Sequence, residues 1–314
     1  MRGAMTCLFL FIIPRVCITA GEIGPFGYAS DTTSILASAQ APDKSRLRIV
    51  NYTTGGLYVL SMSWLYTQWY RDYPHSEFHF FNDNSEWLQI DKYAHTWTAY
   101  NVAKPLMHCY RWAGYDNMKS TLYGTGVALL YQTTIEVFDG FSAEWGFSGG
   151  DMLANAVGAG FFVFQQLHWK EQRIVLKFSY HESAFPKYRS DVLGETFPER
   201  LLKDYNGQTY WITFNPRAFR KSSAFPNWFS LAIGFGGEGM TGGKDNPALI
   251  DGEAIPDFER FRQFYFSIDI DLARVRTKSQ FLESLFKLIN VIHLPAPAIE
   301  FSPGRKVKFH SLYF

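Results

Sequence analysis

The sequence predicts an α+β protein in which a helical bundle precedes an antiparallel sheet. Residues 55–70, 118–138 and 151–169 are long, almost uncharged segments of helical length. After about residue 172, large apolar residues alternate with small or polar ones, as expected of strands. We therefore expect a helical bundle over about residues 55–170, followed by antiparallel strands. A membrane-associated or barrel-like arrangement of these strands stays open.

The N-terminal residues have the order of a secretory signal. A basic residue precedes the apolar residues 5–13, and small residues follow, which predicts a signal peptide over residues 1–20. The residues before Cys17 are a poor lipoprotein signal, so we expect simple cleavage rather than lipidation. Cleavage would leave Cys109 as the only cysteine. Residues 21–54, rich in Ser, Ala, Asp and Pro, predict a loosely ordered lead-in.

The overall composition argues against one class of partner and favours another. The chain carries 30 basic and 29 acidic residues, so no broad nucleic-acid footprint is visible. Aromatic residues make up 18% of the chain and charged residues only 19%. This proportion favours contact with lipid at an interface.

The apolar segments of the bundle lie just below the length of a membrane span, which is roughly 20 residues. They also carry amide side chains, among them Gln132, Asn155 and Gln165. We interpret them as a buried bundle or as one that is sunk partway into lipid. Helices that span an inner membrane are the alternative.

Polar residues recur at helical spacing inside these apolar segments. Side chains three or four residues apart lie on one face of a helix, so each helix gains one polar spot. Buried carboxylates are costly unless they are paired, metal-bound or protonated, and we expect the three spots to converge. The predicted cluster consists of Asp91, Lys92, His95, Glu136, Asp139, Ser148, Asp151 and Asn155. Ser85 or Asn84 is expected to cap the helix that carries Asp91, and Ser148 or Gly149 the start of the helix over 151–169.

The C-terminal half, residues 172–314, is predicted to be β-rich and to follow a bundle over 55–171. Large apolar side chains of residues 264–272 lie on one face of the expected strand and polar ones on the other. Strands are also expected over residues 174–185, 209–214 and 229–236, and an amphipathic helix over 281–294, which prolines end. The terminal strand, closing on Tyr313 and Phe314, resembles that of outer-membrane barrels; an ordinary sheet covering the bundle is the alternative.

The polar spacing also resembles a known family. The matching elements are Asp91-Lys92-x-x-His95, Glu136-x-x-Asp139, Ser148-x-x-Asp151 and Asn155-x-x-Gly158. With them the chain resembles the YfiM-like predicted periplasmic lipoproteins, a family of unknown function, in an extended form typical of Bacteroidota-type envelopes. A looser version of the order is similar to VanZ-like membrane proteins. The resemblance implies an exported protein but no established reaction.

Three roles fit the cluster. A divalent metal could be held by Asp91, His95, Glu136, Asp139 and Asp151, because carboxylates and imidazole are common ligands. A hydrolase or transferase could use His95, Glu136 or Asp139 as catalytic residues, with His95 as the base. A buried polar network could instead fix the register of the helices without catalysis.

From these observations we predict a non-enzymatic protein that is exported and faces the periplasm at the outer membrane. It would act as an accessory or scaffold subunit of an outer-membrane assembly, with the other subunits and lipid as its partners. An envelope-modifying enzyme, metal-dependent or not, is the alternative, as is placement at the inner membrane.

Overall fold

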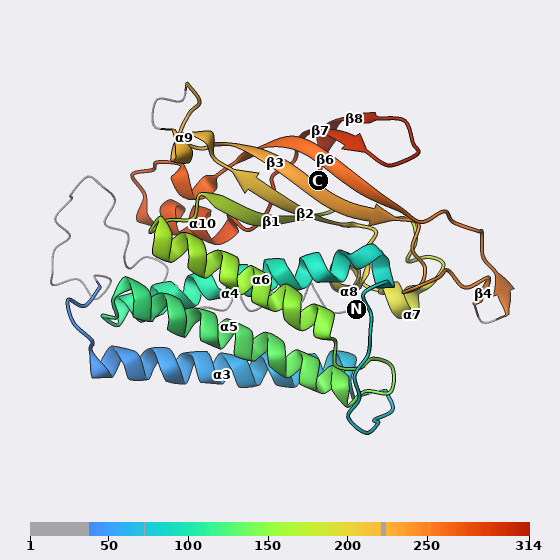
Figure 1. The fold of residues 1–314 in the computed structure, drawn as a ribbon, viewed down its shortest axis with the longest axis horizontal. Helices are drawn as coiled ribbons and strands as arrows, with labels where there is room; N and C mark the ends of the chain where they lie inside the picture. The colour runs from blue at the N-terminus through green and yellow to red at the C-terminus, as the bar shows by residue number, and fades with distance from the viewer. Residues whose placement is uncertain (1–37, 72, 221–223, 251) are drawn as a thin grey trace.

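The computed structural model describes residues 38–314 apart from residues 72, 221–223 and 251. A layer of long helices lies beneath a sheet, with β1 and β2 nearest the helices and β7 and β8 farthest from them (Figure 1). This order of helices followed by antiparallel strands confirms the predicted α+β class. The predicted signal peptide, Cys17 and residues 21–37 of the lead-in lie outside the described residues.

Four helices form the bundle: α3 (Lys44–Trp69), α4 (Ile90–Trp112), α5 (Asn117–Gly140) and α6 (Gly149–His168). The first begins well before residue 55, so part of the predicted lead-in is helical. Its start is set by Asp43, whose carboxylate accepts hydrogen bonds from the backbone N–H groups of Ser45 and Arg46 at 2.8 and 2.9 Å. None of the described helices has the length and hydropathy that a membrane span requires.

The predicted cap of α4 is wrong. Ser85 makes no side-chain cap and instead precedes a short 3₁₀ turn, η1 (Glu86–Gln89). Trp87, Leu88 and Gln89 have φ values of 48°, 51° and 68°, so this turn is left-handed. The peptide N–H of Trp87 donates to Gly243 O at 2.8 Å, which fixes the turn to a distant loop. Helix α4 therefore begins at Ile90 without a side-chain cap.

The main sheet has six antiparallel strands in the order β1-β2-β3-β6-β7-β8. The strands are β1 (Ile174–Tyr180), β2 (Gln208–Phe214), β3 (Phe229–Glu238), β6 (Phe261–Ile270), β7 (Ala296–Phe301) and β8 (Lys308–Tyr313). Strand β1 is shorter than predicted. Strand β7 was not expected, because Pro295 and Pro297 look like a helix stop. Pro297 lies at a shift of register against β8, where its missing N–H is tolerated.

The smaller elements lie around this sheet. A two-stranded sheet pairs β4 (Leu249–Ile250) with β5 (Glu253–Ala254). Short helical elements are α7 (Ser190–Leu193), α8 (Phe197–Lys203), α9 (Pro216–Phe219) and η2 (Leu272–Arg274). The amphipathic helix is α10 (Gln280–Ile289), which ends before the predicted residue 294.

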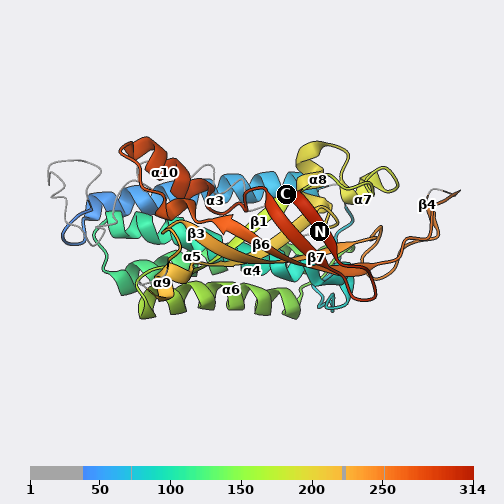
Figure 2. The same ribbon diagram turned by 90° about the horizontal axis from the view of Figure 1, so that it is seen from above.

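Helix α4 connects the bundle to the sheet. Trp97 packs against Phe178 of β1 and Tyr210 of β2, with ring centroids 5.6 and 6.4 Å apart. Tyr93 stacks on Phe235 of β3 at 5.1 Å. Seen from above, the strands cross over the middle of the bundle, with α3 along one side and α6 along the other (Figure 2).

The two faces of the sheet differ sharply. On one face, an apolar row runs across five strands, because paired positions place Ile212, Ile233, Phe266, Ile299 and Phe309 side by side. The other face carries polar, small and aromatic side chains, and most of them are buried. The hydroxyls of Thr209 in β2 and Tyr313 in β8 lie 3.0 Å apart across it, although three strands separate β2 from β8. The sheet therefore curls around its polar face, and β1 and β8 are its edges.

Candidate functional site

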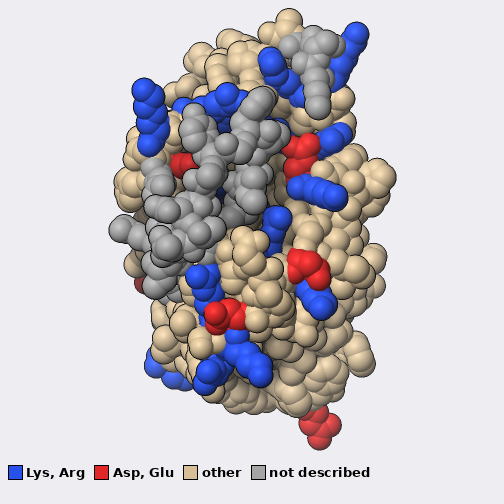
Figure 3. Space-filling model, turned by 90° about the vertical axis from the view of Figure 1, so that its left-hand side faces the viewer, with Lys and Arg blue, Asp and Glu red and all other residues tan. Residues whose placement is uncertain are grey.

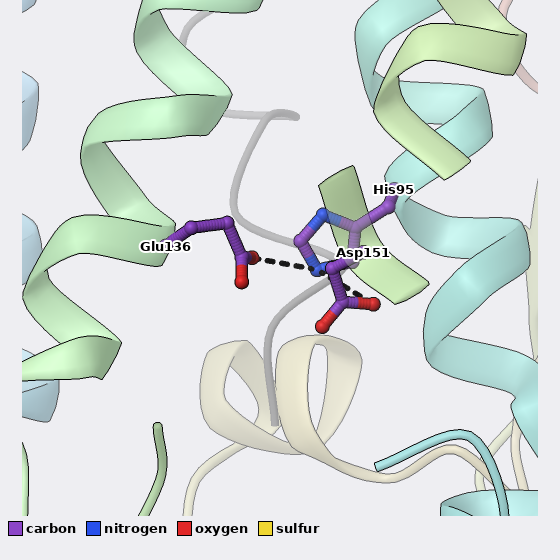
Figure 4. Close-up of side chains that lie close together, drawn as sticks. All are labelled: His95, Glu136 and Asp151. Atoms are coloured by element: carbon purple, nitrogen blue, oxygen red, sulfur yellow. Dashed lines mark ion pairs between the residues drawn. The ribbon is translucent and has the colours of Figure 1, made fainter. Parts of the chain in front are cut away.

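Three of the predicted site residues meet in the interior of the bundle, near the end where α4 and α6 begin and α5 ends. His95 comes from α4, Glu136 from α5 and Asp151 from the first turn of α6, and their side chains point toward one another (Figure 4). His95 Nε2 lies 3.7 Å from Glu136 Oε1 and 3.7 Å from Asp151 Oδ1. All three side chains are 0% exposed.

A second group of acids shares Asp151 with the first. The Lys92 ammonium lies 2.8 Å from Asp83, 2.9 Å from Asp91 and 2.7 Å from Asp151. Burial opposes the charge on Lys92, but the carboxylates of Asp91 and Asp151 outweigh it and raise the lysine pKa. Burial raises the pKa of Asp91, the charge of Asp151 raises it further, and Lys92 partly offsets both. Lys92 is thus held in its charged form among three acids.

Amide side chains orient the imidazole. His95 Nδ1 lies 3.1 Å from Asn155 Oδ1, and that same oxygen accepts a hydrogen bond from Gln132 Nε2 at 2.9 Å. The amide nitrogen of Gln132 also lies 3.3 Å from His95 Nδ1. In the tautomer protonated at Nδ1, His95 donates to Asn155 Oδ1 and presents the lone pair of Nε2 toward Glu136 and Asp151.

Ser148 connects the cluster to the loop before α4. Its hydroxyl accepts a hydrogen bond from the Asp151 N–H at 3.0 Å, which caps α6, and donates to Asp83 at 2.6 Å. Its own backbone N–H donates to Glu136 Oε2 at 3.1 Å. Ser148 therefore holds the carboxylates of Asp83 and Glu136 and the backbone N–H of Asp151.

Asp139 does not join the other acids in a ligand group. Its carboxylate accepts a hydrogen bond from the Tyr70 hydroxyl at 3.0 Å, next to α3. Groups of ligand atoms within 4.8 Å of one another are formed by His95, Glu136 and Asp151, and by Asp83, Asp91 and Asp151. The predicted five-residue metal set is therefore divided in the described part of the chain, with Asp151 common to both groups.

Gly158 allows α4 and α6 to approach closely. A Cβ atom at this position would lie 2.1 Å from the carbonyl oxygen of Thr96 in α4. On the same side of α6, the Thr96 hydroxyl donates to Ala154 O at 3.2 Å. This close contact brings Asn155 and Asp151 to His95, so the last position of the Asn155-x-x-Gly158 pattern has a steric role.

The cluster is enclosed. Asp83, Asp91, His95, Glu136, Asp139, Ser148, Asp151 and Asn155 are each at most 3% exposed. The Lys92 side chain is 14% exposed. Catalytic sites normally open to a cleft, so this degree of closure suits an ion-pair network or a bound ion better than turnover of a substrate.

Sequence reasoning missed two members of the cluster and one separate cavity. Asp83 lies in a loop, outside any helical period. Gln132 lies four residues before Glu136 on α5, and this helical spacing is the signal that could have found it.

The separate cavity, of about 300 Å³, lies on the polar face of the curled sheet. Within it, His310 Nε2 lies 2.8 Å from Glu300 Oε2. Burial opposes ionisation of Glu300, but hydrogen bonds from His310 and Ser302 lower its pKa.

Residues 78–167 match the model of a family described as predicted periplasmic lipoprotein (DUF2279). No curated protein and no solved structure matches the chain. The matched residues run from the loop before α4 almost to the end of α6 and include every member of the cluster. The segment that builds the buried polar centre is thus similar to predicted periplasmic lipoproteins of unknown function.

Proposed function

We propose that the protein is a non-enzymatic component of the cell envelope that faces the periplasm and rests on outer-membrane lipid through its sheet. There it would serve as a scaffold for an outer-membrane assembly. The observation that carries this proposal is the apolar sheet face, formed by Ile212, Ile233, Phe266, Ile268, Ile299, Phe301 and Phe309.

This face is apolar where it is open to solvent. Phe266 is 56% exposed, Phe301 49% and Phe309 70%. Tyr265 and Ala298, which alternate with residues of this face along β6 and β7, are each 1% exposed. Large contiguous apolar patches on a protein surface mark sites of protein or membrane contact. Polar inside and apolar outside is the arrangement of strands that face lipid on one side.

The charge distribution supports contact with anionic headgroups. At the end of the molecule where α3 begins, Lys and Arg outnumber Asp and Glu (Figure 3). Aromatic rings accompany these cations: Arg46 lies 4.8 Å from the centroid of Trp112, and Arg173 lies 5.1 Å from that of Trp169. Cations beside aromatic residues are typical of the membrane–water interface, where anionic lipids attract basic side chains.

The closed cluster supports the non-enzymatic part of the proposal. His95, Glu136 and Asp151 are each 0% exposed, so a substrate would need the three helices to separate before it could reach them. The same side chains bridge α4, α5 and α6, which suits a role in fixing the bundle.

Vesicle flotation tests lipid contact. We expect the full-length protein to float with vesicles that contain anionic phospholipid, and Phe266→Glu with Phe309→Glu to weaken binding by tenfold or more, because each buried Phe contributes about 1.5–3 kcal/mol. Leu249→Glu is the matched control: Leu249 is 61% exposed but lies on the small β4–β5 sheet. A wild-type protein that stays with the aqueous fraction would contradict the proposal.

Purification from outer-membrane fractions in mild detergent tests the scaffold role. We expect the protein to co-purify with specific outer-membrane subunits in a fixed ratio. Elution of the chain alone after chemical cross-linking of intact cells would contradict a scaffold function while leaving lipid contact unaffected.

A further inference from the structure

We propose that His95, Glu136 and Asp151 bind one divalent transition-metal cation of the Zn²⁺ type, which ties α4, α5 and α6 together. This site does not depend on lipid contact, so it goes beyond the scaffold function and can fail or succeed separately. A metal in this place would be structural, because the three side chains are 0% exposed.

The separations within the group fit a shared cation. Hydrogen bonds between nitrogen and oxygen span about 2.7–3.2 Å, so the two distances of 3.7 Å from His95 Nε2 are too long for direct bonds. Zinc lies roughly 2.0–2.2 Å from nitrogen and oxygen ligands, which places two ligands of one tetrahedral ion about 3.4 Å apart, or farther when the angle opens. The three ligand atoms lie within 4.8 Å of one another.

The imidazole is oriented as a ligand. In the tautomer that donates from Nδ1 to Asn155 Oδ1, the lone pair of His95 Nε2 points at two carboxylates. A lone pair facing two anions is repulsive in an interior of low dielectric constant, whereas a cation between them turns the same geometry into attraction. Metal-binding histidines commonly donate their other ring N–H to a neighbouring oxygen, and Asn155 Oδ1 lies 3.1 Å from His95 Nδ1 to accept such a bond.

The carboxylate ligands are also held by further bonds. Glu136 Oε2 accepts the Ser148 N–H at 3.1 Å, which leaves Oε1 directed toward His95. Asp151 Oδ1 lies 2.7 Å from Lys92. Such outer contacts fix the position of ligands before a metal binds.

The charge count favours an added cation. The carboxylates of Asp83, Asp91, Glu136 and Asp151 lie in one enclosed centre with the ammonium of Lys92. Lys92 sits among Asp83, Asp91 and Asp151, whereas Glu136 lies on the His95 side. A divalent cation on that side would offset the excess negative charge, which is costly to bury.

Metal analysis of the full-length protein, purified without chelators, tests the proposal. We expect about one equivalent of zinc per chain, and its removal by denaturation with a chelator followed by refolding. Refolding with Zn²⁺ at a hundredfold excess over Kd should raise the Tm by roughly 5–10 °C relative to refolding without metal. Co²⁺ as a probe should give d–d absorption of a nitrogen and oxygen site.

Two variants locate the ion. Glu136→Gln should abolish stoichiometric binding of Zn²⁺ and the Co²⁺ spectrum, whereas Asp139→Asn, one helical turn away and bonded to Tyr70, should keep both. If Glu136→Gln does not fold, the ¹⁵N shift of His95 Nε2 in the wild-type protein on addition of Zn²⁺ decides instead. Folded wild-type protein that takes up no metal, or binding that survives in Glu136→Gln, would overturn the proposal.

Discussion

The helical bundle and the curled sheet both bury charged side chains, but they balance these charges differently. In the sheet, Lys177 meets Asp269 at 2.6 Å, and both side chains are 0% exposed. In the bundle, Lys92 meets three carboxylates at once. One-to-one pairing neutralises this buried charge in the sheet. The bundle instead holds more carboxylates than ammonium groups, and their contacts require its helices to lie close together.

Removing each lysine sharpens this comparison and should give the largest effect. Lys92→Met is expected to lower the free energy of unfolding by about 3–5 kcal/mol, because it leaves buried carboxylates without their shared cation. Lys177→Met should lower the free energy of unfolding by less, because burial raises the pKa of Asp269 and that single carboxyl can take up a proton. Urea unfolding at neutral pH measures both, and an equal or reversed order would break the contrast.

The sheet interior should respond to acid through His293. Its ring stacks on Trp211 at 3.8 Å, and burial, with nearby Lys177, lowers its pKa from 6.5 to about 3. A lowered pKa means that the unfolded chain binds the proton first as the pH falls. The contribution of neutral His293 to stability is therefore fully present above pH 6.5 and is lost as the pH falls toward 3.

The loss should reach about 2–3 kcal/mol at pH 4.5. His293→Phe keeps an aromatic ring on Trp211 and should remove this part of the pH dependence. Urea unfolding at pH 7 and pH 4.5 provides the measurement. The same acid sensitivity in both proteins would show that His293 is not its source.

Substitution of glycines in α6 tests the close approach of the bundle helices and should change stability by less than loss of Lys92. Gly158→Ala is expected to cost about 1–3 kcal/mol, because the new Cβ would meet the Thr96 carbonyl at 2.1 Å. Gly160→Ala is the matched control: its Cβ meets nothing within 4 Å, so a gain of up to about 1 kcal/mol in helix propensity should remain. Thermal melts of the two variants provide the measurement, and equal melting temperatures would contradict a steric role for Gly158.

The site residues that could be predicted from the sequence are those at helical spacing. Asp91 with His95, and Asp151 with Asn155, were visible because one helix face carries both members of each pair. Asp83 could not be found in this way, since a loop brings it to Lys92 from outside any helical period. Asp139 shows the opposite failure: one turn along α5 from Glu136, it meets Tyr70 of the α3 end instead.

The sheet shows what periodicity leaves open. Alternation along β6 separates Phe266 and Ile268 from Tyr265 and Ser267, but a period of two does not tell which face is covered. Only the curling of the sheet, seen in the contact of Thr209 with Tyr313, shows that the polar face is the inner one. Strand β7 was hidden for a different reason, because its prolines mimic the end of a helix.

The claim that the apolar sheet face lies on lipid is tested most directly by an environment-sensitive fluorophore attached to a cysteine at position 266. The native Cys109 is buried and 3% exposed, and replacement of Cys7 and Cys17 by Ser directs labelling to the new site. On addition of anionic vesicles, emission from position 266 should shift to the blue, and emission from position 249 should not. Emission from position 266 that stays water-like while the protein is bound to vesicles would contradict the account.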